Sequence, residues 1–460
     1  MHPVTRDIEE RVGPGHAAMA FHTARSASPP AAGTRVLVLG SGFAGTTLTR
    51  ALERRLPRDA TITLLSRDNF ITYNPLLPEV VGASILPSQV VAPVRQMLRR
   101  ADFRMVTVTD VDTAAREVHY LGEGLGVMAY DHLVLAFGVG ANLDMVRGMS
   151  RYALPLKTLG DALFLRNRLM VRLEQAELQP DRAARRWLTT FIVVGGGFSG
   201  VEVAGEIADF LRAASPYYAH CSEQDFRVVV LHATAHLLPE LAPRLGDFAM
   251  RKMRKQGIEI HVNVKVSRVD DRGVILDNDE RIEGGTVICT VGTHSNPLVQ
   301  ALGLPTERGR ILTGPDMSIP GHGNLWAIGD CAAVPNALDG RISPPTAQFA
   351  TRQALQLADN LARSLRGRPT RPFRYRAQGQ LSSIGHNKAV AEIRGLRISG
   401  FPAWLLWRAV YLSKMPTLAR KVRVFFEWTW GMLFPPDMVH LRFARTPRTS
   451  PAPIKEVVNG

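Results

Sequence analysis

The sequence has very little cysteine: Cys221, Cys289 and Cys331 are the three thiols among 460 residues. No two of them are close enough to form a C-x-x-C motif, so the sequence indicates neither a disulfide framework nor a zinc site. We therefore expect no bound metal. The cysteine pair that disulfide reductases need near their cofactor is not apparent either. So few thiols are compatible with a reducing compartment.

Long apolar runs are also missing. No uninterrupted apolar run reaches the roughly 20 residues that a helix needs to cross a bilayer. The first 33 residues are polar and mixed in charge, and their one apolar stretch, residues 17–21, is too short for the hydrophobic region of a signal peptide. We interpret residues 1–33 as a disordered tail.

Acidic residues are in the minority: 41 Asp and Glu stand against 56 Lys and Arg, which gives a formal net charge of +15. A basic surplus can serve nucleic acid, dinucleotide phosphates or anionic lipid, or it can reflect a generally basic proteome. The length suggests two to three domains, and an apolar content of 45% is typical of globular proteins.

The ordered part begins with a dinucleotide-binding pattern. The apolar residues 36–39 suit a buried parallel strand, and Gly40-Ser41-Gly42-Phe43-Ala44-Gly45 follows at once with G-x-G-x-x-G spacing. The three glycines allow the tight turn, the approach of a pyrophosphate and the packing of helix on strand. A helix over 46–56, whose N-terminus suits a phosphate, and a strand over 61–65 complete the unit.

The same pattern returns later in the chain. Residues 191–194 lead into Gly195-Gly196-Gly197-Phe198-Ser199-Gly200, a helix begins at Val201, and residues 228–231 form the partner strand. Two such units imply two bound dinucleotides, or one bound dinucleotide and one degenerate unit.

Two later segments belong with the first unit. Residues 130–136 form a strand that closes near Gly138, and residues 324–330 form a buried strand that ends at Asp330. A carboxylate at such a strand end lies in the ligand crevice and can accept hydrogen bonds from a polyol, although it could instead cap the next helix. The second unit is therefore inserted into the first.

We accordingly predict an α/β fold with two Rossmann-like dinucleotide-binding domains and C-terminal amphipathic helices. The predicted domains are a tail over 1–33, a discontinuous first domain over 34–150 and 310–395, a second domain over 151–309, a C-terminal segment over 396–440 and a basic tail over 441–460.

With these motifs the chain resembles the type II NADH dehydrogenases, which are single-subunit NADH:quinone oxidoreductases. The resemblance covers roughly residues 34–435. Besides the glycine motifs and the Gly329-Asp330 pair, it rests on residues 74–77, 130–136, 201–205, 344–348, 384–391 and the aromatic residues 401–407.

The resemblance implies FAD in the first unit and NADH or NADPH in the second. It also implies that Ala347 and Gln348 lie beside the flavin ring on the quinone side, and that Glu202 lies near the point where nicotinamide meets flavin. The expected FAD-binding residues are Gly40, Ser41, Gly42, Phe43, Ala44, Gly45, Ser66, Arg67, Ala136, Gly138, Asp330, Ala347 and Gln348. The expected NAD(P)H-binding residues are Gly195, Gly197, Phe198, Ser199, Gly200, Glu202, His232 and Gly292.

Three positions depart from the family pattern. Ser66 stands where an acid usually holds the adenosine ribose of FAD, although Asp68 lies two residues further on. His232 stands at the matching position of the second unit, so repulsion of a 2′-phosphate is lost and NADPH becomes plausible. Arg352 replaces a family glutamine, which could change the quinone type or indicate another acceptor.

We take Glu202, Gln348 and Arg352 as the candidate catalytic residues. Glu202 falls in the predicted first turn of its helix, where the helix dipole also favours a carboxylate for purely structural reasons. We hypothesise that it orients the nicotinamide or relays protons to quinone. Cys331, beside Asp330, is better explained as a small buried residue than as a reactive thiol.

Aromatic residues are concentrated at the C-terminal end. Trp404, Trp407, Trp428 and Trp430 lie there, and residues 401–460 carry nine Lys and Arg against three acids. Apolar aromatic faces interrupted by cations suit helices that lie in a membrane interface, while a homodimer interface would favour the same residues, and the two can coexist. We expect an anionic lipid surface and a homodimer, and no nucleic acid.

The sequence thus predicts a peripheral NAD(P)H:quinone oxidoreductase on the cytoplasmic face of the inner membrane. NAD(P)H would reduce FAD and leave, and a membrane quinone would then take two electrons without proton pumping. Two alternatives stay open. One is an oxidoreductase with another acceptor, and the other is a membrane-associated redox sensor without catalysis.

Overall fold

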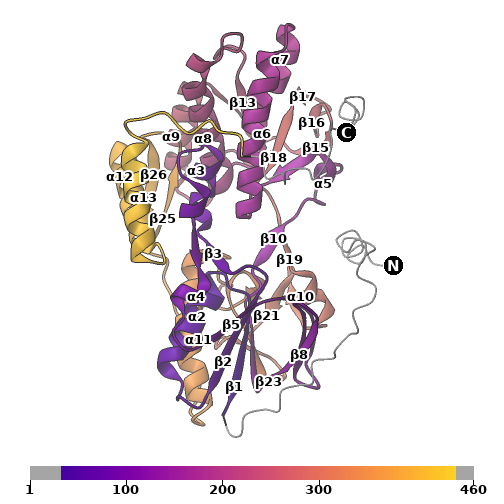
Figure 1. Ribbon diagram of the computed structural model, residues 1–460, viewed down its shortest axis with the longest axis vertical. Helices are drawn as coiled ribbons and strands as arrows, with labels where there is room; N and C mark the ends of the chain where they lie inside the picture. The colour runs from indigo at the N-terminus through magenta and orange to yellow at the C-terminus, as the bar shows by residue number, and fades with distance from the viewer. Residues whose placement is uncertain (1–32, 442–460) are drawn as a thin grey trace, which may run out of the picture.

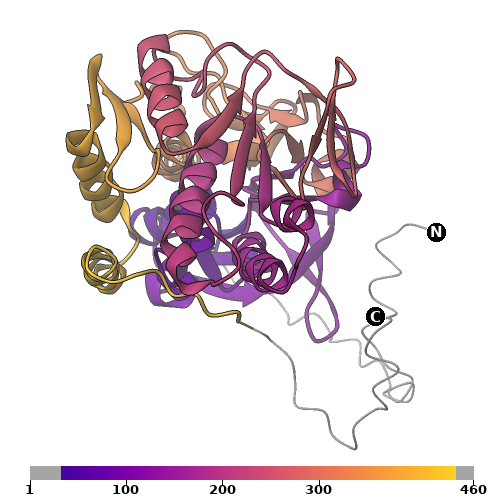
Figure 2. The same ribbon diagram turned by 90° about the horizontal axis from the view of Figure 1, so that it is seen from above.

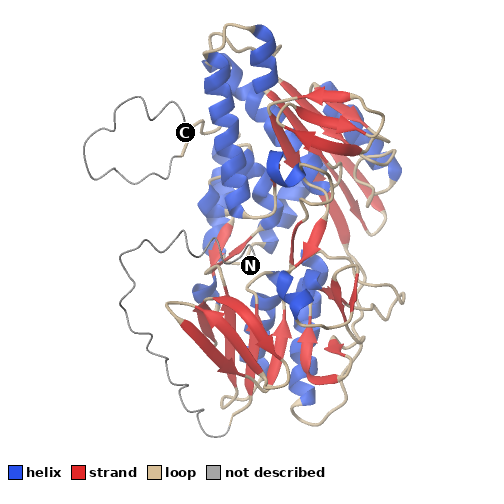
Figure 3. Ribbon diagram, turned by 90° about the vertical axis from the view of Figure 1, so that its right-hand side faces the viewer, coloured by secondary structure: helices blue, strands red, loops and turns tan. Residues whose placement is uncertain are grey.

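The computed structural model describes residues 33–441 as two α/β units joined end to end (Figure 1). Figure 3 shows the strands of the two units as separate groups along the long axis of the molecule. The predicted tails, 1–33 and 441–460, lie outside the described residues except for their single boundary residues.

The first unit is built on a six-stranded sheet in the order β22-β23-β9-β1-β2-β5. Its central strand β1 (Arg35–Leu39) pairs in parallel with β2 (Thr61–Ser66) and β9 (His132–Leu135). Residues 36–39 of β1 are apolar and buried, which is typical of a parallel strand covered on both faces. The outer strands are β5 (Asp102–Met105), β23 (His322–Ala327) and β22 (Ser318–Ile319).

Helices cover one side of this sheet and a small antiparallel sheet covers the other (Figure 1). Helices α2 (Phe43–Arg55) and α11 (Ala347–Ser364) pack against each other. The antiparallel sheet consists of β6 (Thr107–Asp112), β7 (Glu117–Leu121) and β8 (Leu125–Ala129).

The second unit repeats the plan with a five-stranded parallel sheet in the order β11-β18-β12-β13-β14. Its strands are β11 (Ala153–Pro155), β18 (Thr286–Cys289), β12 (Thr190–Val194), β13 (Arg227–Leu231) and β14 (Ile258–His261). Its main helices are α6 (Leu159–Glu177), α8 (Phe198–Ala214) and α9 (Pro243–Lys255), and its antiparallel sheet is β15 (Val266–Asp270), β16 (Gly273–Leu276) and β17 (Arg281–Glu283).

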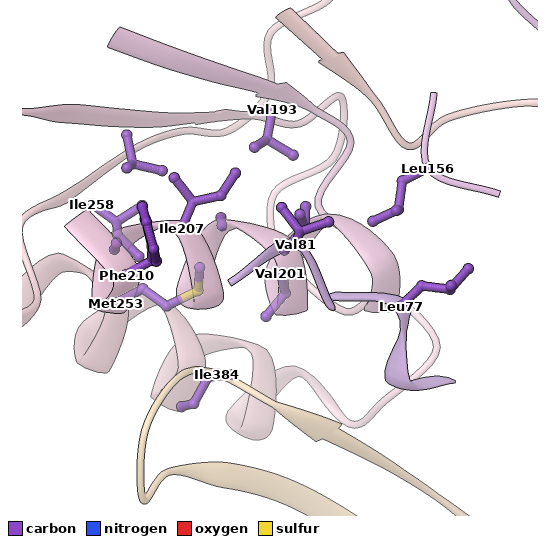
Figure 4. Close-up of a cluster of buried hydrophobic side chains, with 14 of the residues drawn as sticks. Leu77, Val81, Leu156, Val193, Val201, Ile207, Phe210, Met253, Ile258 and Ile384 are labelled. Carbon is purple, nitrogen blue, oxygen red and sulfur yellow. The ribbon is translucent and has the colours of Figure 1, made fainter. Parts of the chain in front are cut away.

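The chain passes between the units as a paired ribbon. Strand β10 (Val139–Ala141) leads into the second unit, strand β19 (Thr293–Ser295) leads out of it, and the two pair antiparallel. The short helix α3 (Leu77–Val81) belongs to the first unit by sequence but packs on α6 and α8. Figure 4 shows Leu77 and Val81 in the same apolar cluster as Val201 and Ile207.

The structure departs from the predicted boundary of the first domain at its C-terminal end. Strands β25 (Gly379–Ser383), β26 (Ala389–Ile393) and β27 (Leu396–Gly400) form an antiparallel sheet that packs on α8, α9 and α12, so residues 379–395 do not join the first sheet. Gly205 of α8 permits this approach, since a Cβ atom there would lie 2.8 Å from the backbone nitrogen of Gly385.

The last two helices of the described chain lie along one flank of the molecule, coloured yellow in Figures 1 and 2. They are α12 (Phe401–Lys414) and α13 (Leu418–Trp430). Between residues 33 and 441, no helix is long and apolar enough to cross a membrane. The remaining elements are short: β3 (Phe70–Thr72), β4 (Val91–Pro93), α4 (Val94–Met97), α5 (Met149–Tyr152), α7 (Arg182–Leu188), α10 (Pro297–Ala301), β20 (Thr306–Glu307), β21 (Arg310–Leu312) and β24 (Ala332–Ala333).

Candidate active site

A cavity of about 1080 Å³ opens along the first glycine turn and reaches the N-terminal part of α8 in the second unit. Both units and the C-terminal helix α12 contribute to its wall. The predicted residues that line it are Gly40, Ser41, Gly42, Phe43, Ala44, Ser66, Arg67, Ala136, Gly138, Phe198, Ser199, Glu202, Asp330 and Ala347.

The first glycine turn has the geometry that a dinucleotide phosphate needs. Gly40 has φ +104°, and a Cβ atom there would lie 2.4 Å from the carbonyl oxygen of Ala136. A Cβ atom on Gly45 would lie 1.8 Å from the carbonyl oxygen of Gly40, so helix and strand touch there. Gly42 faces open space among the described residues and caps the N-terminus of α2, whose N–H groups suit an anion.

Ser66 is held by its neighbour in the glycine turn. Its hydroxyl lies 2.7 Å from that of Ser41, and both residues line the cavity. Asp68 also lines the cavity, and its half-exposed carboxylate is 3.7 Å from the guanidinium of Arg67. A carboxylate is therefore available near the position that lacks the usual acid.

Asp330 lies at the cavity wall where β23 ends. Burial raises the pKa of its carboxyl group, while the charges of Lys157 and Arg310 oppose that shift. Within residues 33–441 no group donates a hydrogen bond to this carboxylate, so it is free to accept one from a polyol ligand. Lys157, which also lines the cavity, was not predicted, because no spacing rule links it to Asp330.

Cys331 turns away from the cavity. Its thiol donates to the carbonyl of Ile328 over 3.3 Å, and burial raises its pKa to about 11. A protonated, fully buried thiol is unreactive, which agrees with its interpretation as a small packing residue.

The second glycine turn repeats the geometry of the first. Gly195 has φ +118°, and a Cβ atom on Gly200 would lie 1.8 Å from the carbonyl oxygen of Gly195. The glycines of this turn, His232 and Gly292 do not line the large cavity, which the second unit reaches through the start of α8 and through Leu156 and Lys157 after β11. Gly292 lies directly before β19, the strand that leads out of the second unit, and its carbonyl accepts from the N–H of Asn142 over 3.3 Å.

Both ring nitrogens of His232 form hydrogen bonds. The N–H of Gly196 donates to Nδ1 over 3.1 Å, and Nε2 lies 2.8 Å from the hydroxyl of Thr234. Since Nδ1 accepts, the proton of the neutral ring belongs on Nε2. Burial lowers the pKa of His232, so the ring is neutral near pH 7 and provides no cation for a 2′-phosphate.

Glu202 lines the cavity, but it does not lie in the first turn of its helix. Helix α8 begins at Phe198 because Gly197 is its N-cap, and Glu202 therefore lies in the second turn, where the dipole has little influence. Its Oε1 accepts from the N–H of Ser383 over 3.2 Å. Burial, and to a smaller extent the nearby Glu79, raises its pKa to about 8.

A buried polar cluster, defined by Glu79, Glu206 and Arg408, continues from Glu202 toward the C-terminal helices. Burial raises the pKa of both carboxyl groups, and the charge of Arg408 opposes the shift. Glu79 accepts from Nε1 of Trp428 over 2.6 Å, and Glu206 accepts from the hydroxyl of Ser84 over 2.7 Å. Sequence reasoning missed this cluster because its members are far apart in the chain.

Gln348 and Arg352 do not line the cavity, whereas Ala347 and Ala350 from the same helix do. The amide of Gln348 is occupied: its Oε1 accepts from the hydroxyl of Tyr375 over 2.6 Å, and its Nε2 donates to the carbonyl of Gly379 over 3.2 Å. Arg352 is exposed and lies 5.4 Å above the ring of Tyr375. The structure thus brings one of the three candidate catalytic residues, Glu202, to the cavity.

Two glycine-turn units, one inserted in the other, with one cavity that both units line, define a two-dinucleotide oxidoreductase. Comparison with known proteins agrees. The family model described as pyridine nucleotide-disulphide oxidoreductase matches residues 34–354, and the NDH2 C-terminal domain matches residues 377–436. The chain therefore belongs to the type II NADH:quinone oxidoreductase (NDH2) family, which confirms the resemblance drawn from the sequence.

The relatives extend along most of the chain. The type II NADH:quinone oxidoreductase Ndh of Mycobacterium tuberculosis is 32% identical and is aligned over 86% of this chain and 87% of its own length. The type II enzyme of Staphylococcus saprophyticus is 26% identical over 82% of this chain and 94% of its own. The structure of Plasmodium falciparum NDH2 in complex with NADH has a TM-score of 0.82 at 19% identity, covering 89% of this chain and all of the other, and shows the shared fold.

Proposed function

We propose that this NADH:quinone oxidoreductase binds FAD in the first unit and the nicotinamide nucleotide in the second, and that the two meet at the shared cavity. The single observation that carries the proposal is that one cavity is lined by the first glycine turn, by Asp330 and by Glu202. Its volume and its open glycine turn suit a dinucleotide. When bound, FAD supplies a ring that accepts a hydride and passes the electron pair on.

The protein's own groups bind and orient the two nucleotides. The N–H groups at the start of α2 bind the pyrophosphate of FAD, and Asp330 accepts from its polyol chain. Ser66 and Asp68 take the place of the usual ribose acid. The N-terminus of α8, beside the second glycine turn, binds the pyrophosphate of NADH in the same way.

Glu202 acts as the proton donor to the quinone. Reduction of a quinone by NADH consumes one proton from solvent, since NADH, H⁺ and quinone give NAD⁺ and quinol. With a pKa of about 8, Glu202 is protonated near pH 7. Because Oε1 accepts the N–H of Ser383, the proton belongs on Oε2, from which it is given to the quinone oxygen.

The experiment that tests this proposal is anaerobic rapid mixing of the flavin-loaded enzyme with NADH and then with a short-chain quinone, followed by flavin absorbance. We expect bleaching by NADH and recovery on addition of quinone. Bleaching without recovery would move the acceptor elsewhere, with Arg352 as the first residue to test. No bleaching of a flavin-loaded sample would contradict the proposed transfer between the two units.

The quinone arrives from a lipid surface on which α12 and α13 lie. The two helices present apolar side chains outward, with Lys414 and Arg423 also exposed beside them. In this proposal the enzyme is peripheral to the cytoplasmic face of the inner membrane. The exposed apolar residues of this face are Phe401, Leu405, Leu418, Val422, Phe425, Phe426 and Trp430.

Flotation with vesicles that contain anionic lipid tests this docking. The double variant Phe425→Asp and Phe426→Asp should no longer float yet should keep its turnover with a soluble quinone. Leu125→Asp, a change at a 77% exposed residue of β8, is the matched control and should float normally. If the double variant instead dissociates a homodimer and the wild type does not bind vesicles, the face is a dimer interface and the lipid proposal is wrong.

A further inference from the structure

The loop after β13, residues 232–241, is fastened to the second glycine turn. The N–H of Gly196 donates to Nδ1 of His232, and the N–H of Leu238 donates to the carbonyl of Gly196 over 2.8 Å. Leu238 adopts φ +53°, a conformation that a leucine rarely takes and that this attachment holds in place. The loop therefore has a defined position beside the N-terminus of α8.

Glu240 of this loop carries its carboxylate to the glycine turn. A Cβ atom on Gly197, the N-cap of α8, would lie 3.7 Å from Oε1 of Glu240. The side chain is exposed, and no group in the described part of the chain forms a hydrogen bond or ion pair with it. The carboxylate is thus free to accept hydrogen bonds and lies beside the N-terminus of α8, where the nucleotide of the proposed site passes.

We propose that Glu240 is the residue that selects NADH over NADPH, by accepting hydrogen bonds from the adenosine ribose and repelling a 2′-phosphate. In units of this kind an acid at the end of the second strand has that role. Here His232 occupies the end of the second strand. Glu240, further along the loop, places its carboxylate beside Gly197 of the second glycine turn. The inference rests on the proposed nucleotide site in the second unit.

The loop of residues 232–241 has no cationic side chain available to bind a 2′-phosphate. It contains neither Lys nor Arg. His232 uses both ring nitrogens in hydrogen bonds, and Nδ1 of His236 lies 2.8 Å from the carboxylate of Asp247, which would balance any charge on that ring. The loss of the strand-end acid therefore does not by itself open the site to NADPH.

Glu240→Gln tests the proposal, with dissociation constants and kcat/KM measured for NADH and for NADPH on the flavin-loaded enzyme. We expect NADH binding to weaken by about tenfold, as for loss of a hydrogen bond to a charged group. Binding of NADPH should stay the same or improve. The ratio of kcat/KM for NADPH to that for NADH should thus rise by about tenfold or more. Glu240→Arg should raise it further, because a guanidinium binds phosphate.

Glu223→Gln is the matched control, since it removes the same charge from an exposed position of the same unit. If Glu240→Gln changes the ratio no more than this control does, Glu240 does not select the nucleotide and the proposal is wrong. The same titration of the wild type distinguishes a failure of the proposed nucleotide site from a failure of the role proposed for Glu240. Wild-type protein that binds neither nucleotide contradicts the nucleotide site itself, whereas normal NADH binding with an unchanged ratio contradicts only the role of Glu240.

Discussion

Glu202 and Gln348 are both assigned to the active site by their positions in the family motifs, but only Glu202 lines the cavity. The carboxyl group of Glu202 is buried at the cavity wall, and its pKa of about 8 suits proton transfer near neutral pH. The amide of Gln348 is used to hold Tyr375 and Gly379. Its role in this structure is to position the segment that follows α11, not to face the cavity.

Glu202→Gln should therefore slow quinone reduction while leaving the bleaching of flavin by NADH nearly unchanged. The loss of a proton donor typically costs about 10²-fold or more. In the wild type the rate of quinone reduction should fall as pH rises through about 8, because Glu202 loses its proton there, and the variant should lack this fall. Rapid-mixing measurements of both half-reactions over pH check this.

Glu206→Gln is the control for this variant, since Glu206 is equally buried on the same helix but does not line the cavity. It should keep the fall in rate near pH 8. If both variants lose the pH dependence, proton transfer is shared along α8 and is not the task of Glu202 alone.

Individual site residues were predictable where a turn dictates them. The spacing of the glycines predicts Gly40 and Gly42 at the phosphate turn and Gly45 at the contact of helix with strand, because such a turn tolerates few alternatives. Lys157 and Glu240 could not be found in this way, since each reaches its place through the path of a loop.

At the scale of elements, the C-terminal helices combine two functions that composition alone could not separate. From the sequence, the four C-terminal tryptophans are expected to suit a membrane interface. In the structure Trp404, Trp407 and Trp428 are buried, and only Trp430 of the four is exposed. The guanidinium of Arg408 lies 3.8 Å from the ring centroid of Trp404. The inner faces of α12 and α13 are therefore part of the protein core, and the outer face exposes Phe, Leu, Val and Trp430 side chains.

Trp428→Phe should destabilise the protein by about 1–3 kcal/mol. The change removes the Nε1–H that donates to the buried carboxyl of Glu79, and a buried group that loses its partner costs about this much. Trp430→Phe, at a 63% exposed position of the same helix, should cost within about 0.5 kcal/mol. Denaturant unfolding of the two variants measures the difference, and equal values would show that the bond to Glu79 contributes nothing.

On the scale of the whole molecule, the buried carboxyl groups couple stability to pH. Burial raises the pKa of Glu79, Glu202 and Glu206 above the value of about 4.3 that a glutamate has in an unfolded chain. The folded state thus holds protons more tightly than the unfolded state does. The stability that these groups contribute is complete below pH ~4.3 and is lost as pH rises through the folded pKa values.

We therefore expect the free energy of unfolding to fall between about pH 4.3 and about pH 8, where the folded state holds protons that the unfolded state has lost. Each such group contributes a slope of up to about 1.4 kcal/mol per pH unit. Glu206→Gln should make the fall shallower, because glutamine does not titrate. Denaturant titrations at several pH values test this, and a stability that is constant over this range in the wild type would rule out the shifted pKa values.

The overall plan of two units was predictable because each unit carries its own strand, glycine turn, helix and strand in order. The exchange of segments between the units was not. Residues 73–90 and 379–400 pack on the second unit although their neighbours in sequence build the first. Their apolar residues indicate burial but do not indicate against which partner, since a hydrophobic contact has no direction.

The antiparallel pair β10–β19 limits how the two units can move. Its two passages of chain are bonded along their length, so sliding one past the other would break the register that joins Val139 to Ser295 and Ala141 to Thr293. A two-stranded ribbon flexes across its flat face far more easily than it shears. Relative motion during turnover should accordingly be a rocking about this ribbon, which widens or narrows the gap between donor and acceptor without changing their alignment along it.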